Sequence, residues 1–421
     1  MGKPNSPKRT LNHVIFLGAG ASFNSGYPIG QGLRLKIATQ ENFNEELRKH
    51  INLDTVIPDT RNAYGKCSNR FADFKESVEL FRHGGFATVD EFSKLASAGH
   101  QEHVQNMKKI MRIVLSIHNP EKQFHESDYY PFIQRLFRDD KLDELRSNIT
   151  ILTYNYDCYF DFLLLEAFRH RQKLSENPQE LNDFWCNKLT GGFFKPDVNL
   201  DWASHTDSFH YYKLHGSLAY GSNMYFGHQA SFRHDDVKRY ENLGEKSIQS
   251  ENPPVVFPWE LFESDSGKFI SEDEFVFVQQ AKDSAAKEKA KKLFQHFKKI
   301  WMNSKWAVER ADKISFVGLS MHEYMADGLA YLFQGKSNGV QAVVANKINE
   351  QFKNPENRLH PSSLCGRVAE MFRTVAPDMK YVRSSSEDDG IFRDKTPDSA
   401  PESDITPRYS FKEFIEREMD S

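Results

Sequence analysis

Three short stretches of this chain carry side chains that could bind a ligand and move a proton. The first is the glycine turn at residues 18–22, which follows an apolar run and contains Gly18, Ala19, Gly20 and Ser22. Glycines let a backbone turn tightly, and N–H groups at the start of a helix can face anionic oxygens. The stretch is therefore typical of a turn that holds a phosphorylated ligand. A plain strand-to-helix turn remains the alternative, because Phe23 stands where the common dinucleotide fingerprint has a third glycine.

The second and third stretches, TYNYD and KLHGS, supply amide, carboxyl and imidazole groups. They contain Thr153, Asn155, Asp157, His215 and Gly216. An asparagine can orient a hydroxyl group or a water without titrating, and a histidine titrates near neutral pH, which suits a general base. The alternative is a polar strand end that bonds its own backbone, together with a histidine satisfied by hydrogen bonds beside a glycine turn.

The elements that position these stretches are predicted strands separated by helical segments. Each strand ends at Gly, Ser, Asn or Asp, and the strands are expected near residues 13–17, 149–153, 210–218, 313–317 and 340–345. Strands that alternate with helices indicate an α/β fold, with a Rossmann-like parallel sheet and helices on both faces. Ligands in such sheets bind beyond the carboxyl ends of the strands, where the three stretches fall.

Other segments complete the predicted organisation. A mostly helical insertion at about 35–145 separates the first two strands, with helical spacing of apolar residues over 89–118, and an amphipathic helix covers 284–301. We expect one domain over 1–382. From 383 to 421 the chain is acidic and rich in Ser and Pro, which predicts a flexible tail whose end can form a short docking helix.

Composition excludes several classes of protein. The net charge is −4, from 55 basic and 59 acidic residues, which does not favour a nucleic-acid binder. The four cysteines form no C-x-x-C pair, so neither a disulfide framework nor a metal site is predicted, and a cytoplasmic location is expected. The longest apolar runs are much shorter than the roughly 20 residues that cross a bilayer, which predicts no membrane association.

The order of the motifs resembles the sirtuin-like NAD-binding family. That family has GAGxS with SGxP, which ends here at Pro28, then TxNxD and then HG. Gly318 and Ser320 match its later G-x-S turn, and Asn346 lies where such proteins hold the adenine end. The resemblance covers about residues 12–345 and implies a sirtuin-like core.

The resemblance also implies roles for these residues. Asn155, His215 and Asp157 would be catalytic: His215 as general base, Asn155 orienting a ribose hydroxyl or water, and Asp157 gripping the nicotinamide end. NAD would be held by Gly18, Ala19, Gly20, Ser22, Pro28, Thr153, Gly216, Gly318, Ser320 and Asn346. NAD would be a substrate, and no metal is implied.

The chain departs from the protein deacylases of that family in three places. It lacks their four-cysteine zinc module, has Tyr154 in place of a glutamine, and has Ile29-Gly30-Gln31 in place of a Phe-Arg pair. Water then becomes the expected nucleophile, which predicts a NAD glycohydrolase that releases nicotinamide and ADP-ribose. A zinc-free NAD-dependent deacylase and a catalytically silent nucleotide-binding regulatory subunit are the alternatives.

The resemblance is closest to bacterial defence-associated proteins that deplete NAD during abortive infection by phage. It implies restraint by self-assembly into a homo-oligomer or by a partner, either an ATPase of the HerA type or an Argonaute-type nucleic-acid sensor. The predicted helix 284–301 is lysine-rich and could touch nucleic acid or an acidic partner. We favour a solvated helix face instead, because Glu288 interrupts the lysines and an apolar face explains the helix.

Overall fold

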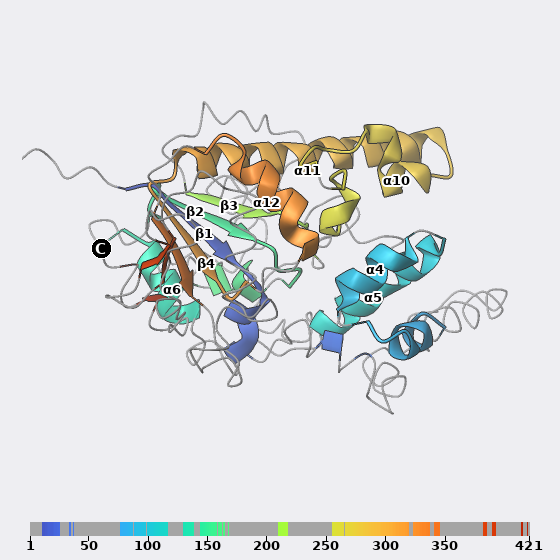
Figure 1. Ribbon diagram of the computed structural model, residues 1–421, viewed down its shortest axis with the longest axis horizontal. Helices are drawn as coiled ribbons and strands as arrows, with labels where there is room; N and C mark the ends of the chain where they lie inside the picture. Colours follow the sequence, from blue (N-terminus) through green and yellow to red (C-terminus); the bar gives the residue numbers. More distant parts are fainter. Residues whose placement is uncertain are drawn as a thin grey trace, which may run out of the picture.

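Figure 1 shows the computed structural model of the chain. The structure describes residues 11–25, 33–34, 37, 76–86, 88–97, 99–116, 129–138, 144–157, 159–161, 163–164, 167, 209–217, 255–264, 266–319, 323–336, 341–345, 382–384, 390–392, 414–415 and 419.

One seven-stranded sheet forms the centre of the molecule, in the order β3-β2-β1-β4-β5-β6-β7. The strands are β1 (His13–Leu17), β2 (Ile149–Thr153), β3 (His210–Lys213), β4 (Lys313–Val317), β5 (Gln341–Ala345), β6 (Val382–Ser384) and β7 (Gly390–Phe392). All neighbours are parallel except β6 and β7. The predicted α/β class with a parallel sheet is confirmed, and the order of the first six strands is that of Rossmann-type sheets.

The register of the sheet brings the turns after its strands to one edge. Leu17 pairs with both Thr153 and Val317, and Thr153 pairs with Lys213. Strands β1 to β4 therefore end level with one another, as the alternation of apolar strands and polar ends predicts. β3 is shorter than predicted because Gly216, at φ +78°, ends it in a turn.

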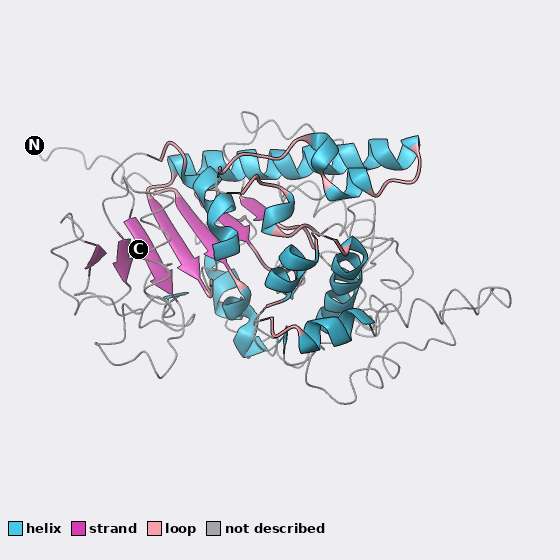
Figure 2. Ribbon diagram, turned by 45° about the vertical axis from the view of Figure 1, so that its right-hand side comes forward, coloured by secondary structure: helices cyan, strands magenta, loops and turns pink. Residues whose placement is uncertain are grey.

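Helices cover both faces of this sheet (Figures 1 and 2). On one face, Phe16 stacks on Phe316 at 4.8 Å between ring centroids and lies near Phe333 of α12 (Ala326–Phe333). On the other face, Tyr211 packs edge-on against Phe160 at 5.2 Å, and Phe160 in turn meets α6 (Tyr129–Leu136). Period-2 alternation along the strands thus sends neighbouring side chains into two separate apolar layers.

The long helix α11 (Ser284–Arg310) lies over the first of these faces and runs past the sheet towards α10 (Val276–Gln279) (Figure 1). It begins where the Asp283 side chain accepts from the Ala286 N–H, and it is longer than the predicted 284–301 because the apolar face continues. On its polar side, Lys291 pairs with acidic residues of η5 (Glu272–Glu274). Part of the lysine-rich surface is therefore neutralised within the chain.

Between β1 and β2 lie the helices α4 (Val89–Ala96), α5 (Gln101–Ser116) and α6. The predicted helix over 89–118 is two helices, because α4 stops at Ser97 and a turn precedes α5. Thr88 starts α4 by accepting from the Glu91 N–H at 3.1 Å. Helices α4 and α5 lie beside the end of α11 that extends past the sheet (Figure 1).

β6 spans the predicted domain boundary at residue 383 and β7 follows it, so the sheet continues past that residue through backbone pairing. The division into a domain over 1–382 and a tail stays a prediction. Near the chain end, Phe414 and Ile415 are helical and buried, and Phe414 meets the His13 ring edge-on at 6.4 Å. No helix in the described part of the chain is long and apolar enough to span a membrane.

Candidate functional site

The glycine turn after β1 leads into the 3-10 segment η1 (Ala19–Ser25) and is bonded to the turn after β4. The Gly18 N–H donates to the Val317 carbonyl at 2.9 Å, and the Gly20 N–H donates to the Gly318 carbonyl at 2.8 Å. The Ala21 N–H returns to the Gly18 carbonyl at 3.0 Å. Three N–H groups of the predicted phosphate cradle are thus used inside the protein.

Close contact between the two turns explains why glycines stand there. A Cβ on Gly18 would lie 2.6 Å from the Gly318 oxygen, and one on Gly20 would lie 2.8 Å from the Gly318 Cα. Gly318 itself has φ +65°, and a Cβ there would lie 2.1 Å from the Ala21 nitrogen. β1 and β4 flank the point where the strand order reverses, which is where such sheets bind nucleotides. The turns pack against each other at that point.

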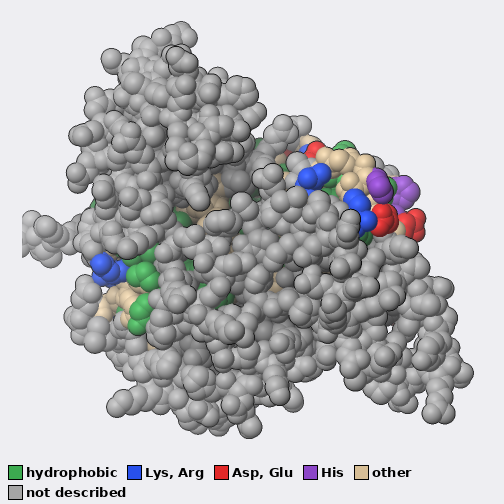
Figure 3. Space-filling model, turned by 90° about the horizontal axis from the view of Figure 1, so that it is seen from below, with side chains coloured by type: hydrophobic (Ala, Val, Ile, Leu, Met, Phe, Trp, Pro, Cys, Tyr) green, Lys and Arg blue, Asp and Glu red, His purple; other side chains and the backbone are tan. Residues whose placement is uncertain are grey.

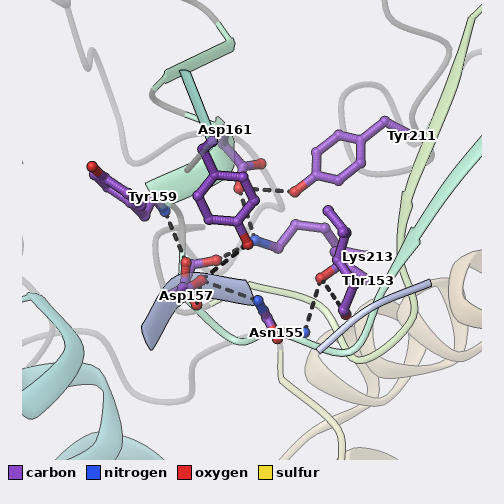
Figure 4. Close-up of polar contacts among 10 residues, drawn as sticks. Thr153, Asn155, Asp157, Tyr159, Asp161, Tyr211 and Lys213 are labelled. Carbon is purple, nitrogen blue, oxygen red and sulfur yellow. Dashed lines mark hydrogen bonds and ion pairs between the residues drawn. The ribbon is translucent and has the colours of Figure 1, made fainter. Parts of the chain in front are cut away.

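Ser22 connects the first predicted motif to the second. Its side chain is fully buried, and its hydroxyl oxygen accepts from Asn155 Nδ2 at 3.3 Å. The same hydroxyl donates to Asp157 Oδ2 at 3.4 Å and lies 3.1 Å from the Tyr129 hydroxyl. The structure therefore brings Ser22, Asn155 and Asp157 together, as the sequence predicts. Figure 4 shows Asn155 and Asp157 side by side.

A buried ion pair lies behind this cluster. Lys213 Nζ is 2.8 Å from Asp161 Oδ2 and also donates to the Asp157 carbonyl, and the Tyr211 hydroxyl donates to Asp161 at 3.0 Å (Figure 4). The Tyr159 N–H donates to Asp157 Oδ1 at 3.0 Å. Burial raises the pKa of Asp157, and the charge of Lys213 opposes that rise.

The sequence interpretation missed the Lys213–Asp161 pair. The available signal was one lysine in the apolar strand HYYK and one aspartate in the apolar run FDFLLLEAF. Charges at such positions are rarely buried without a partner.

His215 is held in one orientation by the segment that contains Val256. Its Nδ1 lies 3.0 Å from the Val256 carbonyl, and because a carbonyl only accepts, Nδ1 carries the proton. The side chain is 1% exposed, beside the Tyr154 ring at 4.9 Å and the Trp301 ring at 5.9 Å. Burial lowers the pKa of His215 to about 3, so the imidazole is neutral at neutral pH.

Two acceptor atoms at this edge have no partner among the described residues: Nε2 of His215 and Oδ1 of Asn155. The backbone of Asn155 is held by Thr153. The Asn155 N–H donates to Thr153 Oγ1 at 3.0 Å, and Thr153 Oγ1 in turn donates to the Leu17 carbonyl at 3.1 Å. The Tyr154 hydroxyl is likewise unpartnered within the described part of the chain. Buried polar atoms are almost always paired, so such a group indicates a place where a water or ligand completes the bonding.

The structure supports no ligand contact for the other predicted residues that it describes. Ala19 is exposed, and Gly216 pairs with Val255 in an isolated antiparallel bridge. The remaining predicted ligand-binding residues, Pro28, Ser320 and Asn346, lie outside the described residues.

A polar contact of the insertion also went unpredicted. The Tyr156 hydroxyl donates to Asp90 Oδ1 of α4 at 3.0 Å, which joins the insertion to the second motif. Burial raises the pKa of Asp90 to about 6, while hydrogen bonds from Tyr156 and Tyr324 oppose the rise.

Histidine and acidic side chains also lie together on the molecular surface (Figure 3). Among the described residues, one group of three could hold a metal: ligand atoms of His100, Glu102 and His103 lie within 4.8 Å of one another. The side chains of His100 and Glu102 are 63% and 67% exposed, and the Ser77 hydroxyl lies 2.8 Å from His103 Nδ1. None of these residues belongs to the predicted site, and the prediction that the protein uses no metal stays a prediction.

Comparison with known protein families finds no matching family model, and comparison with curated proteins finds no match either.

Proposed function

We propose that the protein is a NAD glycohydrolase that cleaves NAD with water to nicotinamide and ADP-ribose. The observation that carries this proposal is the bare Nε2 of His215. It is buried, it lacks a proton because Nδ1 donates to Val256, and it has no partner among the described residues. A neutral imidazole fixed in one tautomer with a free lone pair is what a general base requires.

The chemistry assigns a role to each neighbouring group. Cleavage of the bond between nicotinamide and ribose develops positive charge on the sugar, and water then adds to the ribose carbon and loses a proton. The Asn155 Oδ1 would orient that water or a ribose hydroxyl, and His215 would accept the proton. Burial makes His215 a weak base, with a pKa of about 3. A bound polar substrate or its water would stabilise the protonated imidazole through hydrogen bonds and so raise that pKa.

Asp157 would bind the nicotinamide end through its carboxyl group. The Ser22 hydroxyl donates to that carboxyl group and accepts from Asn155, so one side chain sets the relative position of the other two. This arrangement supports a shared role for the first and second motifs. It does so through side chains rather than through the backbone of the glycine turn.

The glycine turn favours a second candidate, a catalytically silent nucleotide-binding regulatory subunit. The N–H groups of Gly18, Gly20 and Ala21 donate within the protein, and Gly318 occupies the position beside the turn. Pyrophosphate binding there would use other groups or would follow separation of the two turns. A chain whose turns stay together, and that offers the pyrophosphate no other groups, would not cleave NAD.

The cellular role follows from the resemblance and is part of the proposal. A NAD glycohydrolase of the defence-associated type would act as the NAD-depleting effector of an anti-phage abortive-infection system. Its partners would be NAD, further copies of this chain, and a HerA-type ATPase or an Argonaute-type nucleic-acid sensor that triggers it.

The test is incubation of the purified chain with NAD, alone and with each partner type, with products separated by chromatography. We expect nicotinamide and ADP-ribose in equal amounts without any peptide. Turnover that requires an acylated peptide and yields acyl-ADP-ribose would identify a deacylase. NAD binding without turnover under every condition would favour the silent subunit.

A further inference from the structure

A second buried ion pair joins the helical insertion to the segment beside His215. Lys108 of α5 donates to both carboxylate oxygens of Glu260, at 2.8 and 2.7 Å, and the two side chains are 0% and 1% exposed. Glu260 belongs to η4 (Pro258–Glu260), which follows the segment 255–257. The Lys108 ammonium also lies over the rings of Phe257 and Phe277, at 5.2 and 5.0 Å from their centroids.

The Glu260 carboxylate continues this connection towards His215. Its Oε2 accepts from the Phe257 N–H at 2.6 Å, so it fixes the backbone one residue after Val256. Val256 holds His215 twice: its N–H donates to the His215 carbonyl at 3.1 Å, and its carbonyl accepts from His215 Nδ1 at 3.0 Å. The ion pair is therefore connected to the imidazole through the Glu260–Phe257 hydrogen bond, the peptide group between Val256 and Phe257, and the Val256–His215 hydrogen bond.

Fold stability alone does not explain a charged pair at this position. Replacing a buried ion pair with packed apolar residues is often neutral or stabilising, whereas a charged pair fixes its partners in one register. The Lys108 ammonium is surrounded by aromatic rings, those of Phe257 and Phe277. What the pair supplies here is a fixed acceptor for the Phe257 N–H.

We propose that Lys108 and Glu260 are positioning residues that hold His215 in its Nδ1–H tautomer and so make the bare Nε2 dependent on docking of the helical insertion. The catalytic part of this inference rests on the proposed function. The structural part concerns only the imidazole tautomer, which can be measured without NAD turnover. A partner that displaces α5 would change the tautomer of His215 without touching it.

The experiment measures that tautomer by two-bond hydrogen–nitrogen correlation spectra of the full chain labelled with nitrogen-15 histidine. The signals of His215 among the 16 histidines are identified by their loss in His215→Gln. The wild-type chain should show a protonated Nδ1 and a bare Nε2. The double variant Lys108→Met/Glu260→Leu removes both charges together, which avoids leaving one buried charge unpaired.

In this double variant we expect additional His215 signals from the Nε2–H tautomer. If NAD is cleaved, kcat should fall about tenfold to a hundredfold with little change in KM, by analogy with the loss of groups that orient metal-binding histidines. Ser315→Ala is the matched control, because Ser315 is buried and bonds His13 rather than His215. It should leave the His215 signals unchanged.

Two results would overturn the inference. One is a folded double variant in which His215 keeps the wild-type signals. If that variant does not fold, the double variant Lys108→Met/Glu260→Met is measured in its place, because it also removes both charges and the acceptor for the Phe257 N–H. Wild-type His215 signals in it are equally contradictory. A tautomer change in a chain that never cleaves NAD supports the positioning role while rejecting the proposed function, so the two failures are distinguishable.

Discussion

The two halves of the sheet's carboxyl edge are built in opposite ways. Beside β1 and β4, the turns at Gly18–Gly20 and Gly318 bond to each other through their backbones and leave no room for a Cβ. Beside β2 and β3, Asn155 and His215 are held firmly but keep acceptor atoms that no described residue satisfies. Among the described residues, the backbone of the first half bonds to itself, whereas the second half keeps acceptor atoms without a partner. The unpaired acceptors are therefore stronger evidence for a ligand site at this edge of the sheet than the glycines are.

The largest expected effect concerns the incomplete half. His215→Ala should reduce NAD cleavage by about 100- to 10,000-fold, the range contributed by a general base. His13→Gln is the matched control, because His13 is also buried and its pKa is also lowered by burial. His13 begins β1, so it lies at the end of the sheet away from the candidate site. Steady-state rates of nicotinamide release would test this, and equal rates for His215→Ala and the wild type would remove His215 from the mechanism.

The buried Lys213–Asp161 ion pair, which lies behind Asn155 and Asp157, should contribute strongly to the stability of the protein. Lys213→Met leaves Asp161 buried without its ammonium partner, which should lower the free energy of unfolding by about 3–5 kcal/mol. Lys289→Met on the exposed side of α11 is the control and should change it by less than about 0.5 kcal/mol. Urea unfolding measures both. Equal stability of the two variants would show that the ion pair does not support this half of the edge.

The self-bonded half should depend on its glycines. Gly318→Ala places a side chain at φ +65° against the Ala21 backbone, and we expect a loss of about 2–3 kcal/mol in unfolding free energy. Gly99→Ala meets open space and should be nearly neutral. Thermal unfolding would separate them. A fully stable Gly318→Ala would mean that the two turns can move apart at little cost, which would favour pyrophosphate binding between them.

The smallest effect is a pH dependence where the insertion meets the second motif. Folding raises the pKa of Asp90 from 3.8 to about 6, so between these values the folded chain binds more protons than the unfolded chain. Stability from this group is therefore present at low pH and is lost as pH rises through about 6. Between pH 5 and pH 7 the wild type should therefore lose roughly 1 kcal/mol of stability through this group, and Asp90→Asn should remove that loss. Urea unfolding at pH 5 and pH 7 checks it, and identical pH slopes for variant and wild type would contradict it.

The sequence predicted the strands that are defined by a local pattern of residues. β2 and β4 have their predicted bounds because short β-branched, apolar runs end at polar residues. β6 and β7 were missed because three-residue strands are defined by pairing with a neighbour, and because the sequence between them is polar and acidic.

The candidate site shows the same division. Ser22, Asn155 and Asp157 meet because the strand ends are in register, which the motifs indicate. The pairs Lys213–Asp161 and Lys108–Glu260 join residues 52 and 152 positions apart, and no local pattern connects such partners. That His215 would have one satisfied nitrogen and one bare nitrogen depends on Val256, which follows it by 41 positions.

The most direct test of the proposed function is nicotinamide release by Asn155→Ala compared with the wild-type chain, each assayed with NAD alone and with a HerA-type ATPase or an Argonaute-type sensor. Asn155 connects the two motifs and offers the second bare acceptor. We predict equal nicotinamide and ADP-ribose from the wild type, and a rate at least about a hundredfold lower from a variant that melts at the same temperature. Equal rates from the two proteins, or NAD left intact by the wild type, would contradict the account.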